Sequence, residues 1–197
     1  MEHAHRRSWS FALAGIAALS LGGSALAFAI AAGPSADGSD FRAIARIERL
    51  AEVGHGTLRW LGLPVYRATL WSGDGRYGAG ASQPLALTLA YQHGFSRAQL
   101  IDITASEWQR LGLADAALRA RWAELLERIW SDVAAGDEIS VLVVPAAATR
   151  FYHGDRLLGR IEDPAFGPAY LAIWLDARSR VGRLRTELMG PSPGGQP

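Results

Sequence analysis

The residues best placed to do chemistry are two arginines inside strongly apolar sequence. Residues 57–71, TLRWLGLPVYRATLW, contain Arg59 and Arg67 among Leu, Val, Tyr and Trp. In an antiparallel sheet alternate residues share a face, which puts Arg67 beside Thr69. A buried arginine costs free energy unless it is paired. Three interpretations are therefore open for each arginine. It lies on the solvent face, or it is paired with a carboxylate, or it lies at the bottom of an apolar pocket that binds an anionic group.

Two tyrosines accompany these arginines in the same predicted sheet. Tyr66 adjoins Arg67, and Tyr91 lies at the end of a later apolar stretch. A phenol hydroxyl can donate a hydrogen bond to a ligand or, in an enzyme, a proton. The predicted ligand-binding set is Arg59, Arg67, Thr69, Tyr66 and Tyr91, and the sequence assigns no catalytic residue.

A glycine-rich stretch, WSGDGRYGAGAS at residues 71–82, contains the spacing G-x-G-x-x-G. A dinucleotide-binding fingerprint requires a helix directly after the glycines, because the helix N-terminus holds the phosphates. Here Gln83, Pro84 and another predicted strand follow instead. The glycines therefore indicate a connection between two strands of a sheet.

Other chemical classes have little support. His55, His93 and His153 lack metal-ligand spacing, no G-x-S-x-G elbow occurs, and the absence of Cys excludes thiolate chemistry and disulfides. We predict neither a metal nor a cofactor. All 20 basic residues are Arg, and 19 acidic residues balance them, so the charge does not indicate nucleic-acid binding.

The N-terminus has the pattern of an export signal. Arg6 and Arg7 precede the apolar residues 11–32, which contain two A-x-A cleavage candidates. We predict a signal peptide over 1–31, a linker and short helix over 32–47, one domain over 48–190 and a disordered tail over 191–197. The protein would then be periplasmic, with no membrane contact. An uncleaved segment would instead anchor it in the membrane.

The order of elements predicts an α+β fold with a large antiparallel sheet covered by helices. A helix over 41–52 precedes strands over 53–60 and 63–71, and then a strand over 84–95 that alternates Leu with smaller residues and so has one buried face. Two helices capped by Ser96 and Asp115 follow. Three strands over 139–161 and helices over 163–175 and 180–190 complete the chain.

Residues 48–190 resemble the chalcone isomerase superfamily, in its bacterial exported, chalcone isomerase-like branch. The similarity rests on the order of LGLPVYRATLW, LALTLAYQHGFSRAQL, WSDVAAGDEISVLVV, FYHGDRLLGRIEDPAFGPAYLAIWL and LRTELMG. The resemblance implies a large antiparallel sheet covered by helices, an open-faced β-sandwich, with a cleft between the layers. The plant enzymes of the superfamily close a chalcone into a flavanone, and its plant fatty-acid-binding members hold a carboxylate with Arg and Tyr.

The resemblance assigns Arg59 to the early-strand Arg of the family. The strand Thr of the enzymes falls near Arg67, with Thr69 as a substitute, and a later Thr falls at Glu187, beside Thr186. The enzymes' helix Tyr and Asn have no counterparts, because residues 98–133 contain no Tyr and the chain contains no Asn.

We therefore predict an exported, non-catalytic domain that binds a small apolar carboxylate such as a fatty acid. Two alternatives stay open. One is an isomerase of the intramolecular lyase type in which Arg59 stabilises an enolate or phenolate and Tyr66 or Tyr91 donates a proton. The other is a cell-envelope interaction protein without a small ligand.

Overall fold

The computed structural model describes residues 42, 44–45, 48–78 and 83–190. The predicted signal peptide, most of the linker and the C-terminal tail lie outside these residues, so those predictions stand as made. Among the described residues, no helix is long and apolar enough to cross a membrane.

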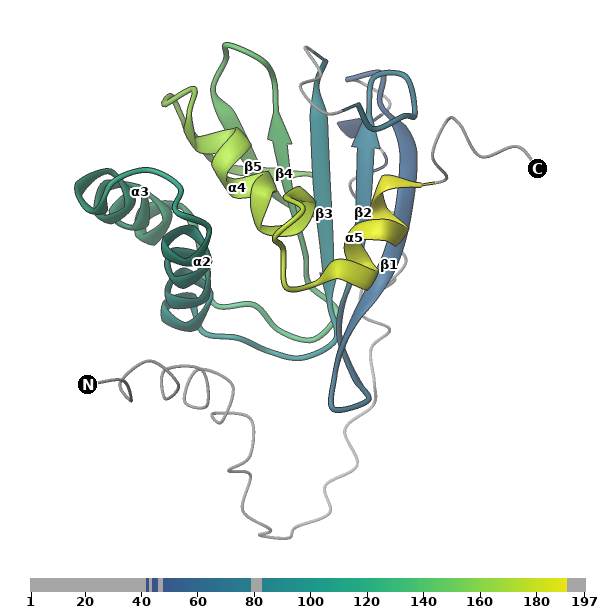
Figure 1. Cartoon of the computed structure of the whole chain (residues 1–197), viewed down its shortest axis with the longest axis horizontal. Coiled ribbons are helices and arrows are strands. Elements are labelled where there is room, and N and C mark those ends of the chain that lie inside the picture. Colours follow the sequence, from purple (N-terminus) through teal and green to yellow (C-terminus); the bar gives the residue numbers. More distant parts are fainter. Residues whose placement is uncertain (1–41, 43, 46–47, 79–82, 191–197) are drawn as a thin grey trace, which may run out of the picture. The chain divides into compact units, whose positions relative to one another are not determined.

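The centre of the fold is a six-stranded antiparallel sheet whose strands follow one another in chain order (Figure 1). The fold class predicted from the sequence is therefore confirmed. The strands are β1 (Ala51–Trp60), β2 (Leu63–Ser72), β3 (Leu85–Tyr91), β4 (Glu138–Val143), β5 (Thr149–His153) and β6 (Arg156–Ile161). The glycine-rich stretch connects β2 to β3, as predicted.

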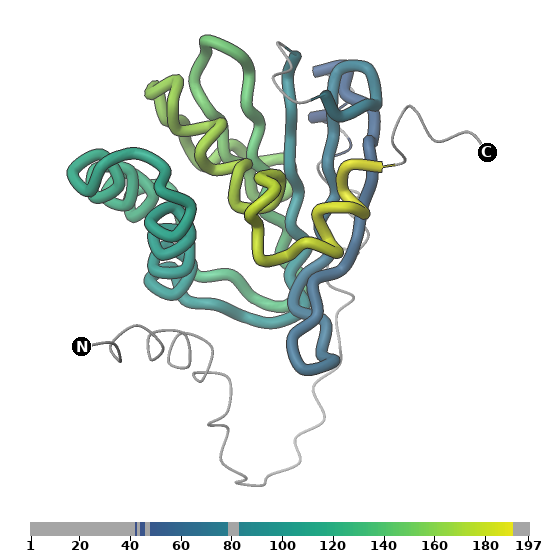
Figure 2. The backbone as a smooth tube through the Cα atoms, viewed as in Figure 1, coloured from purple at the N-terminus to yellow at the C-terminus, as the bar shows by residue number. Residues whose placement is uncertain are grey.

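Four helices with defined bounds accompany the sheet in the described part of the chain, and the caps of α2 and α3 are those expected from the sequence. They are α2 (Arg97–Leu111), α3 (Ala116–Ile129), α4 (Phe166–Leu175) and α5 (Gly182–Met189). Ser96 caps α2 in a capping box with Gln99, and α2 ends at Gly112 in the left-handed conformation. Asp115 accepts from the Leu118 amide at the start of α3. Helix α5 packs on β1 and β2, and α4 lies nearer the later strands (Figure 2).

The register of the sheet separates two sets of side chains. Tyr66 pairs with Tyr91, and Ala68 with Leu89, so these residues share the face that α4 and α5 cover. The alternate residues, including Arg67 and Thr69, lie on the opposite face.

The face opposite the helices has a small core of its own, which corrects the prediction that β3 has one buried face. Thr88 of β3 is 1% exposed, and its hydroxyl links Trp71 Nε1 (3.1 Å) to Ser140 Oγ (2.9 Å). Ala45 belongs to this core. Residues 51 and 52 belong to β1, so the predicted helix over 41–52 extends too far along the chain.

A connected group of aromatic rings packs within the core on the helix-covered face. Phe166 of α4 packs edge-on against Trp108 and Trp122, with ring centroids 5.7 and 5.6 Å apart, and stacks on Tyr170 at 5.9 Å. Trp108 Nε1 also donates to the Ala169 carbonyl (3.1 Å). Edge-to-face rings with a satisfied indole form a stable, tightly filled layer, and this layer positions α2 and α4.

The close approach of α5 to β1 depends on Gly54. A Cβ at this position would overlap the Glu187 carbonyl oxygen and lie 2.9 Å from that of Leu188. We expect Gly54→Ala to lower the free energy of unfolding by about 1–3 kcal/mol, measured by urea denaturation. Gly78→Ala is the control, because a Cβ on Gly78 would meet no atom of the described residues within 4 Å. Equal effects of the two substitutions would show that α5 does not pack on Gly54.

Candidate functional site

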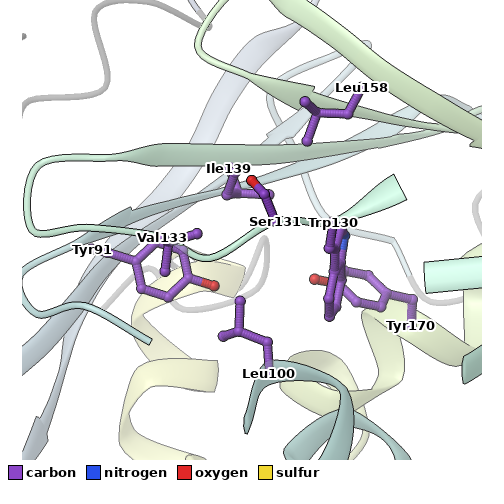
Figure 3. A pocket seen from close by; sticks show the side chains of 8 residues that line it. All are labelled: Tyr91, Leu100, Trp130, Ser131, Val133, Ile139, Leu158 and Tyr170. Carbon is purple, nitrogen blue, oxygen red and sulfur yellow. The ribbon is translucent and has the colours of Figure 1, made fainter. Parts of the chain in front are cut away.

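A small cavity lies between the sheet and the helices. Its volume is about 10 Å³, room for roughly one water molecule. In Figure 3 the hydroxyl ends of Tyr91 and Tyr170 are directed toward each other across the space beside Leu100. The cavity is lined by Tyr91, Leu100, Trp130, Ser131, Val133, Ile139, Leu158 and Tyr170. We call it the aromatic cavity.

A buried hydrogen-bond donor beside the aromatic cavity lacks an acceptor within the described residues. Trp130 Nε1 is buried with no hydrogen-bond partner in the described part of the chain. The hydroxyls of Tyr91 and Tyr170 likewise make no hydrogen bond to a described residue. Tyr66, whose ring lies 6.0 Å from that of Tyr91, accepts from Trp174 Nε1 at 3.0 Å. Buried donors without acceptors are uncommon in folded proteins, so this space is suited to a group that accepts hydrogen bonds.

The three phenols remain protonated at neutral pH. Burial raises the pKa of Tyr66 to about 12, although the Trp174 hydrogen bond opposes this shift. Burial also raises the pKa of Tyr91 and of Tyr170, and the neighbouring phenols add to both shifts. The tyrosines can therefore donate hydrogen bonds but cannot act as bases near pH 7.

A second hollow, larger and open to solvent, lies where the end of β1 faces the start of α5. Its volume is about 560 Å³, within the range of ligand sites. Three of its residues are arginines and one is a glutamate, while Leu58, Val181 and Leu184 supply apolar wall. The lining residues are Thr57, Leu58, Arg59, Arg180, Val181, Gly182, Arg183, Leu184 and Glu187. We call it the arginine groove.

A buried carboxylate lies between the arginine groove and the tyrosines. The Glu107 side chain is 7% exposed, and its Oε2 accepts from Arg110 Nε (2.9 Å) and Nη2 (2.6 Å). Its Oε1 has no hydrogen-bond partner among the described residues and lies 4.0 Å from Arg180 Nη1. The Glu107 charge also contributes to the raised pKa of Tyr66. Glu107 therefore interacts electrostatically with both the groove and the aromatic layer.

The structure divides the five ligand-binding residues predicted from the sequence. Tyr66 and Tyr91 lie together on the helix-covered face, and Arg67 and Thr69 lie on the opposite face. Arg59 is exposed, and its Nη1 donates to the Gly62 carbonyl (3.1 Å). The five residues therefore do not form one site.

The hypothesis of a cation at the bottom of an apolar pocket is wrong for Arg59, which lines the open arginine groove instead. A register shift between Leu58 and Arg59 and the projection of the hairpin beyond β3 carry it away from the covered part of the sheet. Arg67 is partly buried, but its face is turned away from the helices.

Sequence reasoning missed several residues of the two hollows. Trp130 and Tyr170 lie in segments that read only as apolar core. Glu107 had a signal: it occupies the buried face of α2 with Thr104 and Trp108, at helical spacing, where a carboxylate is unusual. No group of three or more His, Asp or Glu that could hold a metal occurs within the described ranges.

The fold belongs to the class of open antiparallel sheets covered on one face by helices. A family model described as chalcone isomerase-like matches residues 72–190, and the chain belongs to that family. A crystal structure of a fatty-acid binding protein of Arabidopsis thaliana has the same fold, with a TM-score of 0.54 and 12% identity over 72% of this chain and 87% of the other. A comparison with curated proteins finds no match.

Tyr66 and Tyr91 provide a matched test of the aromatic layer. Tyr66→Phe removes the acceptor of Trp174 Nε1, and we expect it to lower the free energy of unfolding at pH 7 by about 1–3 kcal/mol. Tyr91→Phe removes no hydrogen bond within the described residues, so we expect a change within about 0.5 kcal/mol. Urea denaturation of both variants measures the difference, and equal losses would contradict it.

The raised phenol pKa values also predict loss of stability in alkali. Above the ordinary tyrosine pKa of about 10, the unfolded chain releases phenol protons while the folded chain keeps them, up to about pH 12 for Tyr66. The folded state binds more protons in this window, so stability is complete below pH 10 and falls above it. Urea midpoints between pH 9 and 12 should fall less steeply for Tyr91→Phe than for the wild type. Parallel curves would show that Tyr91 titrates normally.

Proposed function

We propose that this domain binds a small apolar carboxylate such as a fatty acid and does not catalyse a reaction on it. The observation that carries the proposal is the arginine groove lying next to a layer of neutral, apolar side chains. A carboxylate with an apolar chain requires these two environments side by side.

The groove would hold the carboxylate. Arg59 forms no ion pair with a described residue and donates one hydrogen bond, to a carbonyl. Arg183 is paired with Glu187 (3.0 Å), and Arg180 lies 4.0 Å from Glu107. Planar guanidinium groups bind carboxylates through paired hydrogen bonds. Of the three arginines that line the groove, we therefore expect Arg59 to bind the carboxylate of the ligand.

The apolar chain of the ligand would run from the groove into the aromatic layer. Leu58 lines the groove and pairs with Tyr66 across β1 and β2. Tyr66 in turn packs against Tyr91, which lines the aromatic cavity. The two hollows are therefore joined by consecutive side-chain contacts on one face of the sheet.

Binding requires the aromatic cavity to enlarge, because about 10 Å³ holds no fatty-acid chain. We propose that α3 moves away from the sheet. Helix α3 has only two buried residues, Trp122 and Leu126, whereas α4 has seven. Fewer buried contacts make a segment the cheaper one to displace.

The comparisons support this proposal at the level of the fold, since the similar Arabidopsis structure is that of a fatty-acid binding protein. An isomerase is less well supported, because the three phenols have pKa values too high for acid–base exchange near pH 7. The N-terminal apolar sequence supports export, and we propose that the domain acts in the periplasm.

Displacement of a fluorescent fatty acid by decanoic acid tests the proposal. We expect Arg59→Gln to weaken binding about tenfold or more, because a charge-assisted hydrogen bond is lost. Arg156→Gln is the control: Arg156 is exposed at the start of β6, outside both hollows. The methyl ester of decanoic acid should bind wild type as weakly as the acid binds Arg59→Gln.

Two results would contradict the proposal. Absence of saturable binding to the folded protein would favour an interaction protein without a small ligand. Equal affinities for the acid and its ester, with no effect of Arg59→Gln, would show that the groove does not hold the carboxylate.

A further inference from the structure

We propose that the tip of the β1–β2 hairpin, residues 59–63, docks on an anionic lipid surface. This hairpin tip carries three of the four large apolar residues that are exposed in the described part of the chain. Trp60 is 45% exposed, Leu61 86% and Leu63 60%. The inference rests on these residues and is independent of the proposed ligand.

The hairpin tip projects beyond the rest of the sheet. Strand β3 ends at Tyr91, opposite Tyr66, and the last backbone hydrogen bond on this side joins Gln92 N to the Val65 carbonyl (2.9 Å). From Val65 toward the turn, β2 pairs only with β1. In Figure 1 this end of the hairpin reaches past the other strands. The tip can therefore enter a flat surface before the body of the domain meets it.

The turn itself does not favour the residue found at its apex. Leu61 (φ 48°) and Gly62 (φ 83°) both have positive φ between the paired Trp60 and Leu63, as in a type I′ turn. Asn-Gly is the preferred sequence for this turn, and a leucine there is strained. A strained leucine that is also 86% exposed serves neither the turn nor the core, which points to a function outside the chain.

The charges around the hairpin tip match an anionic lipid surface. The sequence between Glu52 and Asp74 contains Arg59 and Arg67 but no acidic residue. Arg180 and Arg183 line the groove next to Arg59. Tryptophan and leucine partition into the headgroup–acyl boundary of a bilayer, and nearby arginines are attracted to anionic headgroups.

A single labelled cysteine in the full-length chain tests the docking locally. The protein has no Cys, so Leu61→Cys provides a unique site for an environment-sensitive fluorophore. Leu157→Cys is the matched control, an exposed leucine (52%) on the β5–β6 hairpin. A local probe distinguishes docking of the tip from binding through the apolar N-terminal sequence.

With vesicles of phosphatidylcholine and phosphatidylglycerol, we expect the label at 61 to shift to the blue and to be quenched by lipids brominated in the acyl chain. The label at 157 should do neither. Phosphatidylcholine alone or high salt should weaken the signal, because the arginines then lose their attraction to the surface.

A second variant separates the apolar side chain from the turn. We expect Leu61→Asn to keep or raise the urea midpoint, because Asn suits the turn. In the labelled Leu63→Cys protein, the same change should weaken lipid partitioning of the tip about tenfold or more, since a leucine side chain no longer enters the bilayer.

Three outcomes would overturn the inference. The label at 61 could stay in water while the protein sediments with vesicles, which would assign binding to another segment. It could shift without vesicles as protein concentration rises, which would make a second copy the occupant. Finally, Leu61→Asn could leave quenching at position 63 unchanged.

Discussion

The alternation of side chains along β2 keeps arginine out of the layer between the sheet and the helices. Tyr66 faces the helices, and therefore Arg67 on the next residue faces away from them. A shift of one residue in register would exchange the two and place a guanidinium in the aromatic layer. Among the described residues, the observed register keeps Arg67 out of the layer between sheet and helices, at whose edge Glu107 lies.

Glu107 and its two arginines mark the boundary between these environments. Arg110 holds one carboxylate oxygen, while the other has no hydrogen bond within the described structure and faces Arg180 at 4.0 Å. Removing one member of such a buried pair leaves an uncompensated charge, which is usually more costly than the pair itself is worth. A ligand that drew Arg180 toward the groove would therefore change the environment of Glu107 and, through it, that of Tyr66. The groove and the aromatic layer are coupled by this carboxylate.

Local chemistry in the sequence predicted most of the fold. Ser96, Asp115 and Gly112 bound the helices because their side chains or conformations satisfy helix ends, and this requires no knowledge of distant residues. Burial that depends on residues distant in the sequence was harder to predict. Alternation along β3 indicated one buried face, but Ala and Thr are small enough to be buried as readily as exposed. In the structure, Ala45 belongs to the same buried cluster as Ala86 of β3.

The candidate site was harder to predict than the fold for related reasons. Tyr170 lies in a helix that is apolar on all sides, so no periodicity marks which side chains face a cavity. The position of Arg59 depends on a register shift between Leu58 and Arg59 that the sequence pattern does not reveal. Tyr66 and Tyr91 lie on one face because the register of β2 and β3 pairs them, and alternation within each strand does not reveal that register.

In the proposed complex, an acidic apolar ligand would reach from the arginine groove into the aromatic layer. Photo-crosslinking with a fatty acid that carries a diazirine near the end of its chain, followed by peptide mapping, tests this most directly. We expect adducts on β3 and α4, in the peptides that contain Tyr91 and Tyr170, and we expect excess unlabelled fatty acid to suppress them. Suppressible adducts confined to the opposite face, in the peptides of Trp71 or Tyr152, would contradict it.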